Sequence, residues 1–158
     1  MFLKSRNIIF FCAVVLFPSA LKAQIKTYKF EEIDSLYLTQ KKPLVIFLYT
    51  EWCNICLAME NTTFQDEEIA ELLNSEFYFV RLNAEEKKTI DFRDQSFNFN
   101  PNGTNIGIHE LAYQLGNFNG KMIFPTITVL NTDNEIVLHE NSFIKSSHLH
   151  QLLLRLIF

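Results

Sequence analysis

The stretch LVIFLYTEWCNIC, residues 44–56, joins a continuous apolar run to two cysteines that are separated by two residues. Every side chain in residues 44–49 is aliphatic or aromatic, which is typical of a central strand buried on both faces of a sheet. Residues 53–61 follow directly and are predicted to form a helix. The sequence therefore predicts that Cys53 and Cys56 lie where a buried strand turns into a helix.

Helices and strands alternate on both sides of this stretch. Residues 30–40 show apolar side chains at helical spacing. Asp66 is predicted to be the N-cap of a further helix, because acidic residues follow it and apolar residues recur beyond them. Residues 77–82 are predicted to form another strand. The order helix, strand, helix, strand implies two parallel strands joined by a crossover.

The second half of the chain is predicted to contain a short hairpin, a helix, a hairpin of two longer strands and a closing amphipathic helix. In chain order, these elements cover residues 90–92 with 96–99, 108–115, 124–130 with 135–139, and 148–156. The predicted fold class is α/β, with a central mixed β-sheet flanked by helices on both faces.

Residues 1–23 have the features of a secretory signal peptide. A positively charged start precedes an apolar stretch at residues 8–17, and Ala23 offers a small residue for cleavage before Gln24. The apolar stretch is shorter than the ~20 residues that a membrane-spanning helix needs. An uncleaved membrane anchor is the alternative interpretation. The sequence predicts an exported domain at residues 24–158, located in the periplasm or elsewhere outside the cytoplasm.

The mature chain is acidic. Removing the leader takes away Lys4, Arg6 and Lys22 from the 14 Lys and Arg of the whole chain, which leaves 11 against 18 Asp and Glu and a net charge of −7. An acidic domain without a basic stripe argues against a nucleic-acid partner. Apolar residues make up 48% of the chain and include 16 Phe, so one domain with a substantial core is expected.

Cleavage of the leader removes Cys12 and leaves Cys53 and Cys56 as the only cysteines. An intramolecular disulfide must then close the four-residue loop between them, and so small a loop constrains the unfolded chain little. In an oxidising compartment, where cysteines normally form structural disulfides, this pair is better explained as a reactive group.

The spacing of the two cysteines suits thiol–disulfide exchange. A thiolate attacks a disulfide, and a second thiol then resolves the mixed disulfide. A cysteine at a helix N-terminus meets positive partial charge that stabilises its thiolate. We therefore predict that Cys53 is the nucleophile and that Cys56, one turn further into the helix, is the resolving thiol.

Residues 25–158 resemble the thioredoxin superfamily over nearly their whole length. The resemblance is carried by the apolar strand, by the segment Glu51-Trp52-Cys53-Asn54-Ile55-Cys56 and by Phe124-Pro125-Thr126 ahead of the terminal hairpin. It implies a thioredoxin-like fold in which Pro125 is a cis-proline facing the cysteine pair. It also implies that Trp52 and Phe124 contact the substrate chain, and that Cys53 and Cys56 form a redox-active disulfide.

A narrower resemblance is to the C-terminal periplasmic domain of DsbD, a transmembrane thiol-reductant transporter. The segment YTEWCNICLAMENTTF, residues 49–64, is similar to the active-site segment of that domain. Glu60 matches an acidic residue there, which implies a role as proton acceptor when Cys56 attacks. Two positions depart from the active-site pattern of that domain. Phe47 stands where a buried acid is usual, and Leu57 stands directly after the second cysteine, where a basic residue is often found.

The resemblance implies an exported oxidoreductase that acts on protein thiols and disulfides, leaning towards reduction with electrons from a membrane donor. No cofactor is predicted, and the chain is expected to act as a monomer. Residues 89–107 have no counterpart in a minimal thioredoxin and are predicted to be an insertion.

The cysteine pair has two other interpretations. Zinc normally needs four ligands, and two thiolates supply only half of them, while the four His lie far from the motif in the sequence. No metal site is therefore predicted. A non-catalytic binding module for a client or partner is the other alternative, although the presence of both cysteines, Trp52 and Pro125 speaks against it.

Overall fold

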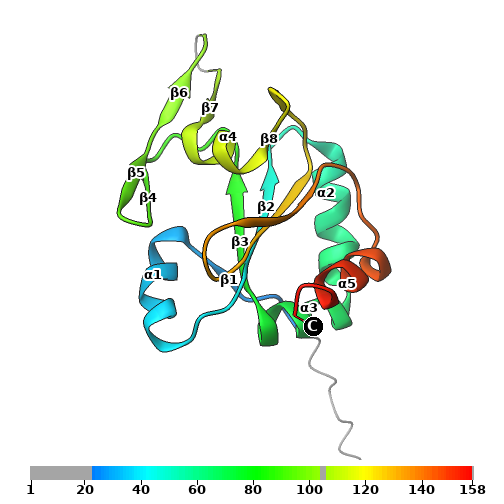
Figure 1. The fold of residues 1–158 in the computed structure, drawn as a ribbon. Coiled ribbons are helices and arrows are strands. Elements are labelled where there is room, and N and C mark those ends of the chain that lie inside the picture. The colour runs from blue at the N-terminus through cyan, green and yellow to red at the C-terminus, as the bar shows by residue number, and fades with distance from the viewer. Residues whose placement is uncertain (1–22, 104–105, 158) are drawn as a thin grey trace, which may run out of the picture.

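The apolar run at residues 44–49 forms β2, the middle strand of a five-stranded mixed sheet with the order β1-β3-β2-β10-β11 (Figure 1). The structure is a computed structural model that describes residues 23–103 and 106–157. The predicted signal peptide at residues 1–23 lies outside the described residues, apart from Ala23. The strands of the sheet are β1 (Thr27–Tyr28), β2 (Leu44–Tyr49), β3 (Tyr78–Asn83), β10 (Thr126–Leu130) and β11 (Ile136–Glu140).

Strand β2 has one parallel and one antiparallel neighbour, so the sheet is mixed. It runs parallel to β3 on one side, with Phe47 opposite Arg81, and antiparallel to β10 on the other, with Phe47 opposite Ile127. A parallel pair needs a crossover, and helical segments between β2 and β3 supply it. The predicted helix–strand–helix–strand order and the α/β fold are thereby confirmed.

Helices cover both faces of the sheet (Figure 1). One face packs against α1 (Phe30–Thr39) and α4 (Glu110–Gly116). The other face packs against α2 (Asn54–Asn61), the short 3-10 helix η1 (Thr63–Gln65), α3 (Glu67–Glu76) and α5 (Ser146–Leu154). Because side chains of a strand alternate between faces, neighbouring residues of β2 enter two separate buried clusters.

Asp66 caps α3 as the sequence predicts. Its carboxylate accepts hydrogen bonds from the backbone N–H groups of Glu68 and Ile69, at 3.1 and 3.2 Å. These two N–H groups have no partner inside the helix, so the side chain satisfies donors that would otherwise depend on water.

Replacing Asp66 by Ala is expected to lower the free energy of unfolding by about 1 kcal/mol, because the first turn of α3 loses this acceptor. Urea unfolding followed by far-UV circular dichroism measures the change. Asp66→Asn keeps an acceptor and should recover most of the loss. Glu71→Ala, at an exposed position of the same helix, is the matched control. An Asp66→Ala protein as stable as the control would contradict the assigned cap.

The predicted insertion at residues 89–107 consists of two antiparallel ribbons. The expected hairpin is present as β4 (Ile90–Phe92) and β5 (Gln95–Phe97). A second ribbon, not predicted, pairs β6 (Phe99–Pro101) with β7 (Gly107–His109) and extends away from the sheet (Figure 1). The prediction of a helix from residue 108 is wrong at its start, because Ile108 belongs to β7 and α4 begins only after His109.

Two further pairings were not predicted. Strand β1 is only two residues long and pairs with the edge of β3. Strands β8 (Asn117–Phe118) and β9 (Lys121–Met122) form a small hairpin through Asn119 and Gly120, both of which have positive φ. An Asn-Gly pair favours such a turn, so the signal was present in the sequence. The strand expected from residue 124 begins at Thr126, directly after Pro125.

Candidate functional site

The cysteine pair lies where the chain leaves β2 and enters α2. Cys53 is the N-cap residue of α2, and Cys56 lies in the first turn of that helix. The two sulfurs form a disulfide with a Cα–Cα distance of 5.2 Å. Cys53 is 8% exposed and Cys56 only 1%. Cys53 is therefore the sulfur that a second molecule reaches more readily.

The Cys53 sulfur accepts a hydrogen bond from one backbone N–H group at the start of α2. The Cys56 N–H donates a hydrogen bond to Cys53 Sγ over 3.1 Å, and the Cys53 N–H donates to the Thr50 carbonyl over 3.1 Å. The first contact is an N-cap interaction, since a side-chain atom accepts from the third residue of the helix. After reduction, the same N–H and the positive end of the helix would stabilise a thiolate at this sulfur.

An aromatic surface lies beside the disulfide. Trp52 is 66% exposed, and its ring meets Phe124 edge-on with 6.2 Å between the ring centroids. Phe124 in turn packs against the buried cluster that contains both cysteines. The Phe124–Pro125 peptide bond is cis, and Pro125 is buried ahead of β10. Trp52 is therefore an exposed aromatic residue and not a cap on the core.

A polar network that the sequence did not indicate holds Trp52. Its indole Nε1 donates a hydrogen bond to Glu85 Oε1 over 3.1 Å. The Asn83 side chain accepts from the Glu85 N–H at 3.0 Å and donates to Glu51 at 3.4 Å. Asn83 and Glu85 lie at and just beyond the end of β3, which runs parallel to β2, so both meet the residues that follow β2.

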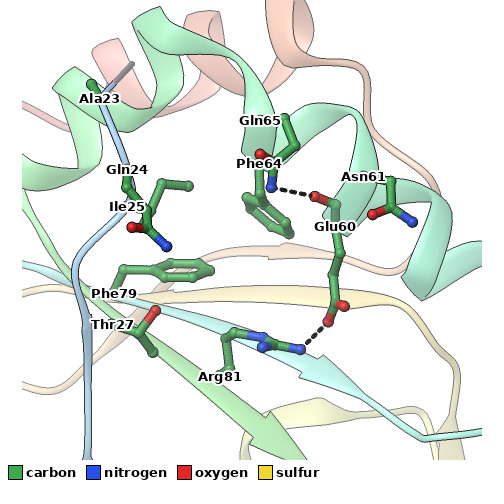
Figure 2. A pocket seen from close by; sticks show the side chains of 10 residues that line it. All are labelled: Ala23, Gln24, Ile25, Thr27, Glu60, Asn61, Phe64, Gln65, Phe79 and Arg81. Atoms are coloured by element: carbon green, nitrogen blue, oxygen red, sulfur yellow. Dashed lines mark hydrogen bonds and ion pairs between the residues drawn. The ribbon is translucent and has the colours of Figure 1, made fainter. Parts of the chain in front are cut away.

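Glu60 lies one turn beyond Cys56, but its side chain is engaged with another element. Its carboxylate forms an ion pair with Arg81 of β3. Figure 2 shows this pair on one side of a pocket of about 480 Å³ that lies between the end of α2, β3 and the segment leading into β1. The guanidinium of Arg81 also lies over the Tyr49 ring, 4.8 Å from its centroid.

Aromatic side chains surround Phe47, which belongs to the same buried cluster as both cysteines. Phe47 is fully buried, stacks on Tyr49 with 5.9 Å between centroids and meets Phe64 edge-on at 4.8 Å. Burial raises the pKa of the Tyr49 phenol, and nearby Arg81 opposes this rise. The phenol therefore stays protonated at neutral pH, so neither Phe47 nor Tyr49 takes up a proton from the cysteine pair.

Within residues 23–103 and 106–157, no three His, Cys, Asp or Glu side chains gather closely enough to hold a metal ion. No helix in this same part of the chain is both long and apolar enough to cross a membrane.

The comparisons with known proteins agree with the architecture. Residues 32–102 match a family model described as thioredoxin-like. A thioredoxin from Thermus thermophilus has 14% sequence identity and a TM-score of 0.59, over 85% of this chain and 88% of its own. The DsbH oxidoreductase has 15% identity and a TM-score of 0.59, over 97% and 96%. No curated protein sequence matches the chain.

The C-terminal domain of DsbD from Neisseria meningitidis, in its oxidised form, is also similar, with 16% identity and a TM-score of 0.52 over 79% of this chain and 90% of that domain. Fold and site together define a thioredoxin-like fold with a disulfide between two cysteines at CxxC spacing. The resemblance to the thioredoxin superfamily is confirmed, and the DsbD domain is among its structural neighbours.

Proposed function

We propose that the chain is an exported thiol–disulfide oxidoreductase that reduces disulfides in protein substrates through Cys53 and Cys56. The observation that carries the proposal is the position of Cys53 Sγ. It accepts the Cys56 N–H at the N-terminus of α2, and Cys53 is the more exposed of the two cysteines. Trp52 and Phe124 lie beside it as contact surfaces for a substrate chain.

The proposed reaction has two displacement steps. The Cys53 thiolate attacks one sulfur of a substrate disulfide, and the other substrate sulfur leaves as a thiolate and takes a proton. Cys56 then loses its proton and attacks Cys53 Sγ, which releases the second substrate sulfur and closes the Cys53–Cys56 disulfide. Two electrons pass to the substrate. Glu60, the acidic group one turn beyond Cys56, is the proposed acceptor of the Cys56 proton.

The charges beside Cys53 support the reducing direction. A strong oxidant of this class stabilises its reduced form. Here the hydrogen-bond network next to the disulfide ends on the carboxylates of Glu51 and Glu85. Negative charge disfavours a thiolate, whereas the helix N-terminus favours it. We therefore expect a reduction potential nearer to about −270 mV than to about −120 mV, the range that related proteins span.

The compartment and the electron source complete the proposal. The signal-peptide pattern of residues 1–23 supports export. The likeness to the DsbD C-terminal domain, both in the segment around the cysteines and in the fold, supports a membrane donor of electrons. The chain is proposed to act as a monomer.

Insulin reduction tests the proposal. In the presence of a dithiol donor, the mature protein is expected to accelerate the precipitation of insulin chains, and Cys53→Ser is expected to reduce the rate to that of the donor alone. Equal rates for both proteins would favour the binding-module interpretation. Equilibration of the Cys53/Cys56 pair with glutathione measures its reduction potential and so the direction of electron transfer. A potential near the oxidising end of the range, about −120 mV, would overturn the reductase assignment.

A further inference from the structure

The surface around the disulfide has an apolar part and an acidic part. The apolar part consists of Trp52 and Ile55 beside the cysteines and Ile123 and Phe124 ahead of Pro125, and the first three are exposed. The acidic part consists of Glu51, Glu85 and Glu86, which follow β2 and β3 at their neighbouring ends. A substrate that reaches Cys53 meets both parts.

The three carboxylates are held in place by neutral donors. Glu85 accepts from the Trp52 indole at 3.1 Å, and Glu51 accepts from the Asn83 amide at 3.4 Å. Glu86 accepts from the backbone N–H groups that follow it, at 2.9 and 3.0 Å. A neutral donor fixes the position of a carboxylate and leaves its negative charge in place.

No cationic side chain forms an ion pair with these carboxylates within the described residues. The ion pairs there are Arg81 with Glu60 and Arg93 with Asp34, so the arginine next to the site is already engaged. Lys87 and Lys88 follow Glu86 along the chain, are exposed and form no ion pair in the described part of the protein. The acidic part is thus open to a cation supplied from outside.

We propose that Glu51, Glu85 and Glu86 select substrates whose reactive cysteine is flanked by Lys or Arg, with an apolar side chain contacting Trp52 and Phe124. This inference rests on the proposed function, because it concerns the polypeptide that exchanges disulfides with Cys53. Opposite charges attract across such an exposed surface at low ionic strength, and the attraction weakens as salt screens it. The net negative charge of the mature chain also favours the approach of a positively charged substrate.

Kinetics with charge-varied peptides test the inference. The substrates are quenched fluorescent peptides of equal length, each joined to a second copy by one disulfide, with Lys, Gln or Glu flanking the cysteine. The pre-reduced protein supplies the two electrons, and the recovery of fluorescence gives the rate. At about 0.01 M salt we expect the Lys peptide to react roughly tenfold faster than the Glu peptide, and at about 1 M salt the two rates should agree within about twofold.

Matched variants show which side chains produce the difference in rate between the Lys and Glu peptides. Glu85→Gln and Glu51→Gln each keep a hydrogen-bond acceptor and should lower the Lys-to-Glu rate ratio by about two- to threefold. Lys87→Gln should raise the ratio, because it removes a competing positive charge. Glu71→Gln changes the net charge equally at an exposed position of α3 and should leave the ratio unchanged.

The neutral Gln peptide separates the two possible failures. If the wild-type protein reduces it no faster than Cys53→Ser does, the proposed function fails. If the Gln peptide is reduced but the Lys-to-Glu ratio is near one and does not respond to salt, only the charge selection is wrong. The charge selection is also wrong if Glu71→Gln lowers the Lys-to-Glu ratio as much as Glu85→Gln does.

Discussion

Replacing Cys56 by Ser is expected to turn the protein from a catalyst into a trap that stays covalently attached to its substrate. The Cys53 thiolate still attacks a substrate disulfide, but no thiol then lies one helical turn away to displace the substrate. The second step is fast in the wild type because it is intramolecular, with effective concentrations that reach about 10⁵ M or more in well-oriented cases. Turnover should therefore fall close to the level of Cys53→Ser.

Electrophoresis without reductant detects the mixed disulfide. The reduced Cys56→Ser variant is first mixed with a disulfide-containing protein, and the products are then separated by mass. We expect a band at the combined mass that disappears with dithiothreitol. Cys53→Ser is the matched control and should trap little, because its remaining thiol at Cys56 is only 1% exposed. Trapping by Cys53→Ser and not by Cys56→Ser would reverse the assigned roles of the two cysteines.

The central part of this architecture could be predicted from the sequence because its signals are local. The apolar run of residues 44–49 specifies a strand buried on both faces, and the cysteines follow it directly, so their place at a helix N-terminus required no long-range information. The same holds for Asp66, whose role as an N-cap depends on the residues that immediately follow it.

The parts that could not be predicted depend on contacts between distant residues. Trp52 and Glu85 are 33 positions apart, and nothing in the residues near either of them announces their hydrogen bond. Helical spacing placed Glu60 one turn beyond Cys56, yet it could not show that the carboxylate lies against Arg81, 21 positions away. Strand β1 is too short to show an alternation of apolar and polar residues, and only its pairing with β3 defines it.

His109 is a further residue whose position depends on distant contacts. It ends β7, is the N-cap of α4 and is fully buried. Its Nδ1 accepts from the Leu111 N–H at 3.2 Å and caps α4. The neutral ring then carries its proton on Nε2, which donates to the Lys88 carbonyl at 3.2 Å. One side chain thus connects the insertion, α4 and the loop after β3.

Replacing His109 by Ala is expected to lower the free energy of unfolding by about 3 kcal/mol. The change leaves a cavity at a fully buried position, removes the cap of α4 and leaves the Lys88 carbonyl without this donor. Urea unfolding measures the loss. His109→Asn keeps a capping acceptor and should cost less than His109→Ala, while His148→Ala, at an exposed position of α5, should change stability by less than about 0.5 kcal/mol.

The same substitution should also disturb the candidate site, because His109 is bonded to both ends of the loop that carries Glu85. Its backbone N–H donates to the Ala84 carbonyl at 2.8 Å, and its ring donates to Lys88. Loss of the ring contact frees one end of the loop, so the bond between Glu85 and the Trp52 indole should weaken. Trp52 is the only Trp in the chain, and its emission below the unfolding transition reports this directly. Unchanged Trp52 emission in a destabilised His109→Ala protein would show that the loop keeps its shape without the histidine, and that His109 acts on α4 alone.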